Sequence, residues 1–262
     1  KPVGKGTGLG LSVAKAIVEE HNGTIEVMNH SRGVTFRLSF PKSVDGDGQH
    51  NKVSAAILAG GQSKRMGKDK ALLTFDGKAM IKHVIETVLS RVNDVMIISN
   101  QPEFYASLGL PVYPDEIQSC GPLAGIYTAL RHSTSRHCLV VACDLPFISK
   151  SMIQFLCENC AAYDVLVFES ESGLEPLCAV YSKNCLPIIQ EQIKNHRYRV
   201  SDFYEKVNTH IVRLNPELVF YDSKAFMNIN TREELQQAHE LLHESNSYNI
   251  KHGLSEHENT DC

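Results

Sequence analysis

Residues 53–58 (VSAAIL), 80–92 (MIKHVIETVLSRV) and 94–99 (DVMIIS) follow one another as a strand pattern, a helix pattern and a second strand pattern. The first and third are short, continuous apolar runs, whereas the apolar residues of the second recur at helical spacing. Two buried strands joined by a helix lie parallel in one sheet, because the helix returns the chain to the end of the sheet at which the first strand begins. The segment therefore predicts an α/β fold.

The same alternation continues along the chain. Strand-like runs occupy residues 110–115, 138–147 and 164–169, and helical patterns occupy residues 121–133 and 151–160. Strands that alternate with helices are typical of a parallel sheet covered on both faces. We expect a Rossmann-like α/β fold with a mostly parallel sheet and helices on both faces.

Composition divides the chain into four parts. Residues 42–52 (KSVDGDGQHNK) lack apolar periodicity and are polar and glycine-containing, which is typical of a linker. Residues 1–41 precede this linker and residues 53–242 follow it as the α/β domain. Residues 243–262 are polar and histidine-containing, and we expect them to be a disordered tail rather than a metal site.

The overall charge and the apolar runs limit the partners. A formal net charge of −4 argues against general affinity for nucleic acid or anionic membranes. No apolar run has the roughly 18–20 residues needed to span a bilayer, and no secretory signal is recognisable. We expect a cytoplasmic protein without nucleic-acid or membrane partners, although the sequence begins at Lys1 and its true start can be missing.

Eight cysteines are scattered through apolar segments, which favours reduced thiols over a disulfide framework. Cys157 and Cys160 form one CxxC pair inside a helical pattern. A single pair is a weak signal for zinc or redox chemistry, so we expect both side chains to pack as helix residues.

The residues after each strand are candidates for ligand binding, because ligands of open parallel sheets bind beyond the carboxyl ends of the strands. The first strand is followed by Gly60 and Gly61, whose missing Cβ atoms let backbone N–H groups approach phosphate. Positive charge follows at Lys64, Arg65, Lys68 and Lys70. The loop matches neither GxxxxGK[ST] nor GxGxxG, so the glycines alone fit a phosphate loop and a surface turn equally well.

Two aspartates also follow strand-like runs. Asp144 stands at the end of the most apolar strand pattern. A carboxylate at this place can hold Mg²⁺ or cap the next helix, and its position alone favours neither role. Asp115 ends the run 110–115, and Gly121 with Pro122 then opens a helix whose N-terminus favours anions. Taken alone, this second segment fits an ordinary loop.

Taken together, these segments resemble one family. The motifs LAGGxSxRMGxDKALL (58–73), PDxxxxxGPLAGI (114–126), CDLPF (143–147) and FMNINTREEL (226–235) resemble the MobA-type molybdenum cofactor guanylyltransferases in order and spacing. The resemblance covers about residues 53–240. It implies a Mg²⁺-dependent nucleotidyltransferase that moves GMP from GTP to the phosphate of Mo-molybdopterin and releases pyrophosphate. A site rich in positive charge without a Ser/His/Asp arrangement suits such chemistry.

The resemblance also implies roles for individual residues. Catalytic roles fall to Lys70, Arg65 and Asp144; nucleotide binding to Leu58, Gly60, Gly61, Lys70, Asp115 and Asp144; pterin-substrate binding to Arg199, Asn228 and Asn230; and the metal to Asp144. A capped helix start remains an alternative for the two asparagines, and an exposed charge for Arg199. Molybdopterin-delivery proteins and molybdoenzyme acceptors are the implied protein partners.

Other functions remain open at this point. A related cytidylyltransferase or sugar-phosphate nucleotidyltransferase would share the fold, but cytidine-using relatives tend to carry AAG in place of LAGG. The NIN element at residues 228–230 is not expected in sugar-phosphate enzymes. A signalling module is the alternative from another functional class.

That last alternative comes from the front of the chain. Residues 4–27 (GKGTGLGLSVAKAIVEEHNGTIEV) and 33–41 (GVTFRLSFP) resemble the C-terminal end of the ATPase domain of sensor histidine kinases. The resemblance implies a glycine box, a helix at residues 11–21 and a hairpin; the box comprises Gly4, Gly6, Gly8 and Gly10. About 40 residues bury too little surface to fold reliably alone, so we expect no ATP binding by this piece itself.

Overall fold

The computed structural model describes residues 15, 18, 24–30, 33–39, 53–60, 70–227, 229, 234–238 and 240. The side chains of residues 29, 30, 38, 39 and 70 lie outside this description. The chain divides into two compact units, Lys1–His50 and Asn51–Cys262.

The first unit contains a two-stranded antiparallel hairpin. It consists of β1 (Thr24–His30) and β2 (Gly33–Ser39). Val27 pairs with Phe36, and the neighbouring pair places Glu26 beside Arg37, with 3.7 Å between their charged atoms. Strand pairing at this register confirms the predicted hairpin.

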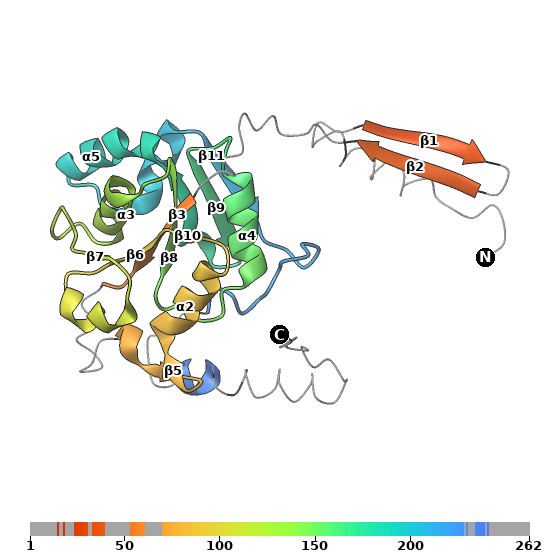
Figure 1. Ribbon diagram of the computed structural model, residues 1–262. Coiled ribbons are helices and arrows are strands. Elements are labelled where there is room, and N and C mark those ends of the chain that lie inside the picture. The colour runs from red at the N-terminus through yellow and green to blue at the C-terminus, as the bar shows by residue number, and fades with distance from the viewer. Residues whose placement is uncertain are drawn as a thin grey trace. The chain divides into compact units, whose positions relative to one another are not determined.

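The second unit is built on one seven-stranded sheet (Figure 1). Its strand order is β11-β9-β10-β8-β3-β6-β7. The strands are β3 (Val53–Leu58), β6 (Val95–Ile98), β7 (Val112–Tyr113), β8 (His137–Ala142), β9 (Val165–Ser170), β10 (Gly173–Ser182) and β11 (Thr209–Arg213). Two short strands, β4 (Thr74–Phe75) and β5 (Lys78–Ala79), form a separate antiparallel pair.

The sheet is mostly parallel, as the alternation of strands and helices predicted. β3 runs parallel to β6 and β8, β6 parallel to β7, and β9 parallel to β11. β10 is antiparallel to both of its neighbours, β8 and β9. β10 was not predicted from the sequence, because its Pro176 argues against a strand inside a sheet.

The structure accommodates this proline through a register shift. Between Leu174 and Ala179, the pairing of β10 with β9 slips. The hydroxyl of Tyr181 donates to the carbonyl of Pro176 at 2.7 Å and also contacts the hydroxyl of Tyr204 at 2.7 Å. A side chain thus satisfies a carbonyl that the strand ladder cannot.

Helices cover both faces of the sheet, which confirms the predicted layering (Figure 1). The α-helices are α2 (Met80–Leu89), α3 (Pro122–His132), α4 (Lys150–Asn159) and α5 (Leu186–Lys194). The 3-10 turns are η1 (Lys70–Leu72), η2 (Pro102–Phe104), η3 (Ala106–Leu108), η4 (Lys183–Cys185) and η5 (Val200–Lys206). α2 and α4 pack in one core layer, whereas α3, α5 and η5 pack in the other.

Strand β3 shows why its sequence is apolar throughout. Ala55 and Ile57 belong to the core layer with α2 and α4, whereas Ala56 belongs to the layer with α3. All three are fully buried. A central strand with helices on both faces has no solvent side, so it lacks the polar alternation of a half-exposed strand.

The CxxC pair lies in and just after α4, as the helical pattern predicted. Cys157 and Cys160 are free thiols that pack in the core layer with α2 and α4. Burial raises the pKa of the Cys157 thiol to about 12 and that of the Cys160 thiol to about 11. Because the thiolate is the reactive form, both residues are almost entirely unreactive thiols at neutral pH.

We therefore expect slow alkylation of these two cysteines in the folded protein. Iodoacetamide labelling at neutral pH, mapped by peptide mass, should modify Cys157 and Cys160 much more slowly than a free cysteine derivative. In guanidinium chloride, the difference should disappear. Equal rates in the folded and unfolded protein would contradict the burial and the raised pKa values.

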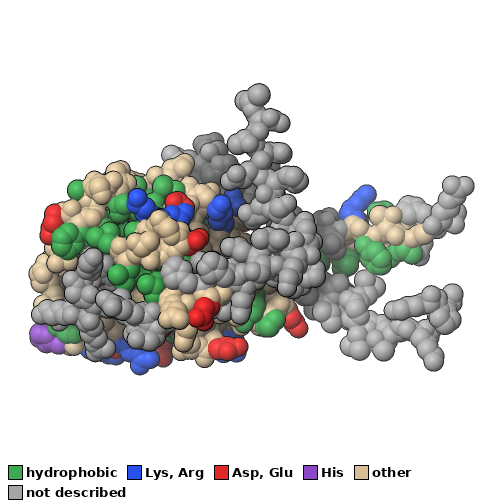
Figure 2. Space-filling view, turned by 90° about the horizontal axis from the view of Figure 1, so that it is seen from below, with side chains coloured by type: hydrophobic (Ala, Val, Ile, Leu, Met, Phe, Trp, Pro, Cys, Tyr) green, Lys and Arg blue, Asp and Glu red, His purple; other side chains and the backbone are tan. Residues whose placement is uncertain are grey.

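The described surface is mixed in charge. On the face shown in Figure 2, Lys and Arg side chains are interspersed with Asp and Glu side chains.

Among the described helices, none is both long enough and apolar enough to cross a membrane.

Candidate active site

The carboxyl ends of four parallel strands meet at one edge of the sheet. Leu58, the last residue of β3, pairs with Ala142 of β8 on one side and with Ile98 of β6 on the other. Ile98 in turn pairs with Tyr113, the last residue of β7. The segments that follow these residues therefore leave the sheet side by side, at the edge where ligands of this class of fold bind.

Backbone hydrogen bonds extend the sheet beyond these strand ends. The N–H of Ala59 donates to Ile98 at 2.9 Å, and that of Cys143 donates to Leu58 at 3.1 Å. The N–H of Ser99 donates to Tyr113 at 2.9 Å. These bonds fix the directions in which the chain departs towards Gly60, Asp144 and Asn100.

Leu58 and Gly60 are the two described members of the predicted phosphate loop. Leu58 is half-buried and lies against Gly125 of α3, where a Cβ atom would come within 3.1 Å of a Leu58 methyl group. Gly60 is exposed, and a Cβ atom there would meet open space. The other predicted members, Gly61 and Arg65, lie outside the described residues.

The positively charged side chains of this loop are likewise not described. Lys64 and Lys68 lie outside the described residues, and Lys70 is described only as the first residue of η1. The adjacent Ala71 is almost fully buried in the core layer with α2 and α4. The backbone of η1 is thus anchored in the core directly after Lys70.

Asp144 lies in the turn after β8. It is half-buried, and it stands between Cys143, which is bonded to β3, and Leu145, which is buried in the core. This turn is held on both sides of the carboxylate. The donor set suits Mg²⁺, which accepts one carboxylate and takes its remaining oxygens from ligand and water. Among the residues that the structure describes, no three His, Cys, Asp or Glu side chains gather as a metal cage.

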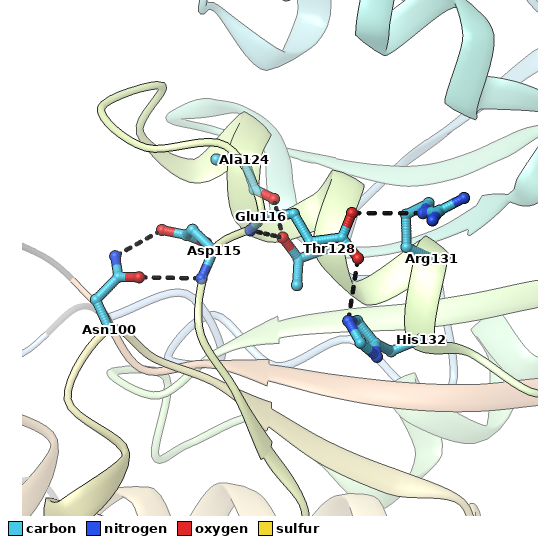
Figure 3. Close-up of polar contacts among 7 residues, drawn as sticks. All are labelled: Asn100, Asp115, Glu116, Ala124, Thr128, Arg131 and His132. Carbon is cyan, nitrogen blue, oxygen red and sulfur yellow. Dashed lines mark hydrogen bonds and ion pairs between the residues drawn. The ribbon is translucent and has the colours of Figure 1, made fainter.

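Asp115 lies two residues after β7 and contacts Asn100, which follows β6 (Figure 3). The amide of Asn100 donates to Oδ2 of Asp115 at 2.8 Å, and its oxygen accepts from the backbone N–H of Asp115 at 3.0 Å. Burial raises the pKa of the Asp115 carboxyl above its ordinary value, and the hydrogen bond from Asn100 acts in the opposite direction.

The residue after Asp115 ties the loop to α3 (Figure 3). The N–H of Glu116 donates to the hydroxyl of Thr128 at 2.9 Å, and that hydroxyl donates to the carbonyl of Ala124 at 2.9 Å. The Glu116 carboxylate lies 3.4 Å from Arg131 and 3.1 Å from His132, both in the last turn of α3. The loop therefore has a fixed position relative to the helix.

The start of α3 depends on a special backbone conformation. Gly121 precedes the helix with φ 60° and ψ −149°, a combination that is almost exclusive to glycine. Pro122 follows at the first helical position, where its missing N–H costs nothing. The predicted helix start at Gly121 and Pro122 is confirmed.

The residues predicted for the pterin substrate are only partly described. Arg199 is exposed, and its carbonyl accepts a hydrogen bond of 2.8 Å from the buried amide of Gln192. Its guanidinium makes no hydrogen bond or ion pair with any described residue. Asn228 and Asn230 lie outside the described residues.

Ile229, which stands between these two asparagines in the sequence, is described by the structure. It is fully buried in a small cluster with Phe75 and Met80, and Phe147 packs against the same cluster. Phe147 comes three residues after Asp144, and its ring lies 5.4 Å from that of Phe75. The structure therefore brings Ile229 next to Phe147, in the segment that follows Asp144.

Two residues of this edge, Asn100 and Glu175, were not predicted from the sequence. Asn100 follows a strand in the same way as Asp144, so the strand-end rule could have identified it. Glu175 could not be found, because β10 was not predicted. Its carboxylate accepts a hydrogen bond of 2.6 Å from Ser170, and burial raises its pKa while that bond lowers it.

Comparison with known families gives two matches. Residues 55–210 match the family described as "MobA-like NTP transferase domain". Residues 1–44 match the family described as "Histidine kinase-, DNA gyrase B-, and HSP90-like ATPase".

Individual relatives match most of the second unit. A protein of Pelotomaculum thermopropionicum, named "Probable molybdenum cofactor guanylyltransferase", is 39% identical over 74% of this chain and 95% of its own length. The "Molybdenum cofactor guanylyltransferase" of Desulfosudis oleivorans is 34% identical over 71% of this chain and 94% of its own length.

A solved structure is similar over the same region. The crystal structure of "Molybdopterin-guanine dinucleotide biosynthesis protein A" from Archaeoglobus fulgidus superposes with a TM-score of 0.63 at 25% identity. The match covers 73% of this chain and 100% of that chain.

Proposed function

The chain belongs to the MobA-like NTP transferase family, and from this premise we propose that it transfers GMP from GTP to the phosphate of Mo-molybdopterin. The convergence of Leu58, Asp115 and Asp144 at one sheet edge is the observation that carries the proposal. The names of the relatives support guanylyl transfer in particular.

The proposal assigns the binding of GTP to the strand-end segments. Leu58, Gly60 and Gly61 lie against guanine and the phosphates, and Arg65 and Lys70 offset the negative charge of the phosphates. Asp115 holds the nucleotide through its carboxylate. Backbone N–H groups and cations together suit a triphosphate, because both supply donors to its oxygens.

Mg²⁺ belongs to the proposal through Asp144. When bound there, the cation would neutralise phosphate charge during transfer. The support is the carboxylate's position at the carboxyl end of β8, in a turn anchored on both sides.

In the proposed reaction, an oxygen of the molybdopterin phosphate attacks the α-phosphorus of GTP. The bond between the α-phosphorus and the bridging oxygen breaks, and pyrophosphate leaves with both electrons of that bond. The chain contributes alignment and charge stabilisation, with no covalent intermediate on the protein. Arg199, Asn228 and Asn230 position the pterin substrate.

The proposal extends to the chain's organisation and surroundings. Residues 53–242 form the catalytic domain, and residues 1–41 and 42–52 are a kinase-derived fragment and a linker. The boundary between the two compact units, after His50, supports the linker assignment. Delivery proteins and molybdoenzymes are the proposed partners, and the cytoplasm is the proposed location.

Transfer of a label tests this function. In the presence of Mg²⁺, the protein should transfer an α-phosphate label from GTP to Mo-molybdopterin. Without the acceptor, the label should remain in GTP. Transfer from α-labelled CTP instead would favour the cytidylyl alternative. Absence of labelled product with every nucleotide would contradict nucleotidyl transfer.

Lys70 provides a quantitative test of the phosphate loop. Lys70→Ala should lower kcat/KM for GTP by at least about tenfold, which corresponds to about 1.4 kcal/mol for one charge-assisted contact. Lys82→Ala removes an exposed lysine from α2 and is the matched control, which should keep the full rate. Equal kcat/KM values for the two variants would show that Lys70 is a surface residue without a role in GTP binding.

A further inference from the structure

Asn100 holds Asp115 by two hydrogen bonds of different kinds (Figure 3). One bond, of 2.8 Å, runs to the carboxylate, and the other, of 3.0 Å, comes from the backbone N–H of the same residue. One amide plane thus sets both the backbone direction and the carboxylate orientation of Asp115. Asn100 itself follows Ser99, which is buried and bonded to β7.

The other side of Asp115 is held as well. Glu116 donates its N–H to Thr128, whose side chain is fully buried in α3. Asp115 therefore lies between an attachment to the end of β6 and an attachment to α3. A carboxylate held from both sides loses little further freedom when a ligand binds.

Only one of the two carboxylate oxygens of Asp115 is used by these contacts. Oδ2 accepts from Asn100, whereas Oδ1 makes no hydrogen bond with any residue that the structure describes. A carboxylate accepts hydrogen bonds at both oxygens, so Oδ1 can take an N–H or O–H donor of a ligand. Burial favours the neutral carboxyl of Asp115, and the donor on Asn100 opposes this by stabilising the charged form.

We infer that Asn100 is a positioning residue for the nucleotide, which acts through Asp115 by directing Oδ1 to an N–H or O–H donor of the bound nucleotide. The inference rests on the proposed function for the identity of the ligand. Asn100 itself need not touch the nucleotide.

A purely structural role for the same bond is the alternative, and the chain offers a matched control. Asn184 donates to Asp164 at 2.8 Å, also between an asparagine and an aspartate at the surface. Asn184 follows Ser182, the last residue of β10, which pairs with the first residue of β8. The control bond therefore lies at the opposite edge of the sheet from Asp115.

The experiment is a double-mutant cycle on the full chain. Asn100→Ala, Asp115→Ala, the double variant, Asn100→Asp and Asn184→Ala are compared in calorimetric Kd for Mg-GTP, in KM and kcat, and in thermal midpoint. We expect Asn100→Ala to raise Kd and KM by about tenfold, the scale of a hydrogen bond to a charged group, and to leave kcat nearly unchanged. In the Asp115→Ala background, the same change should raise neither Kd nor KM further.

Two further results are expected. Asn100→Asp should weaken binding more than Asn100→Ala, because a second carboxylate faces Asp115. Asn184→Ala should shift the thermal midpoint as much as Asn100→Ala does while it binds GTP like the unmodified protein. The inference would be overturned if Asn100→Ala still lowered GTP affinity in the Asp115→Ala background. It would also be overturned if Asn100→Ala alone bound GTP normally.

Failure of the proposed function gives a different pattern. If the unmodified protein binds CTP or ATP in place of GTP, the cycle is run with that nucleotide. Coupling between Asn100 and Asp115 would then support the inference, whereas the proposed use of GTP would be wrong. If the unmodified protein binds none of the three nucleotides, both the proposed function and the inference are wrong.

Discussion

Replacement of Asp144 by alanine should abolish nucleotidyl transfer, with kcat reduced by at least about a thousandfold, while the protein stays folded. The reason is that a carboxylate at the end of β8 is the proposed holder of Mg²⁺, whose charge stabilisation is worth several kcal/mol. The same side chain is only half-buried. Its loss should therefore change the free energy of unfolding by about 1 kcal/mol or less.

The measurement combines turnover with denaturant unfolding. Asp144→Asn keeps the shape of the side chain and should be nearly as inactive as Asp144→Ala, because the amide lacks the negative charge. Glu103→Ala removes an exposed carboxylate from η2 and serves as the control with full activity. An unchanged rate for Asp144→Ala with Mg²⁺ would remove Asp144 from the mechanism.

Gly125 gives the second large effect, through packing. It lies in α3 directly over Leu58, and an added Cβ atom would come within 3.1 Å and 3.2 Å of the two Leu58 methyl carbons. Alanine gains about 1 kcal/mol of helix propensity over glycine, which offsets the tight contact. Gly125→Ala should therefore leave stability within about 1 kcal/mol of the unmodified protein.

Gly125→Val should have a larger cost. The additional methyl groups overpack the contact, which costs typically about 1–3 kcal/mol. Because Leu58 is the proposed guanine contact, its displacement should also raise KM for GTP by about tenfold or more. Unfolding and steady-state kinetics on the two variants measure both effects.

A second substitution tests the stated cause. In Gly125→Val/Leu58→Ala, the alanine frees the space that valine needs, so the double variant should lose less stability than the two single changes predict by addition. If the changes in the free energy of unfolding were strictly additive, the cost of the valine would not come from its contact with Leu58. Normal stability and normal KM in Gly125→Val would contradict the close approach of α3 to β3.

Much of this edge followed from one rule about strand ends. Asp115 and Asp144 stand where the apolar strand patterns end, and the structure places both just beyond the point where parallel strands terminate side by side. Asn100 obeys the same rule but carries no charge, and a neutral amide after a strand looks like any turn residue. The rule therefore marks its position, whereas its two hydrogen bonds to Asp115 are visible only in the structure.

Other features depend on contacts between distant segments. The contact of Gly125 with Leu58 joins a helix to a strand that lies far away in sequence, and no local pattern indicates it. Strand β10 was missed because Pro176 interrupts its pattern, and the hydroxyl of Tyr181 that compensates comes from further along the same strand. Local sequence therefore predicted the layers and strand ends, whereas packing decided which side chains meet.

The central claim is that this chain uses GTP for nucleotidyl transfer. Its most direct test is pyrophosphate release with Mg²⁺ and Mo-molybdopterin, with GTP, CTP and ATP compared at equal concentration. We predict release at least about tenfold faster with GTP than with either other nucleotide, because a site that hydrogen-bonds one base rejects the others. Faster release with CTP or ATP, or none with any nucleotide, would contradict the claim.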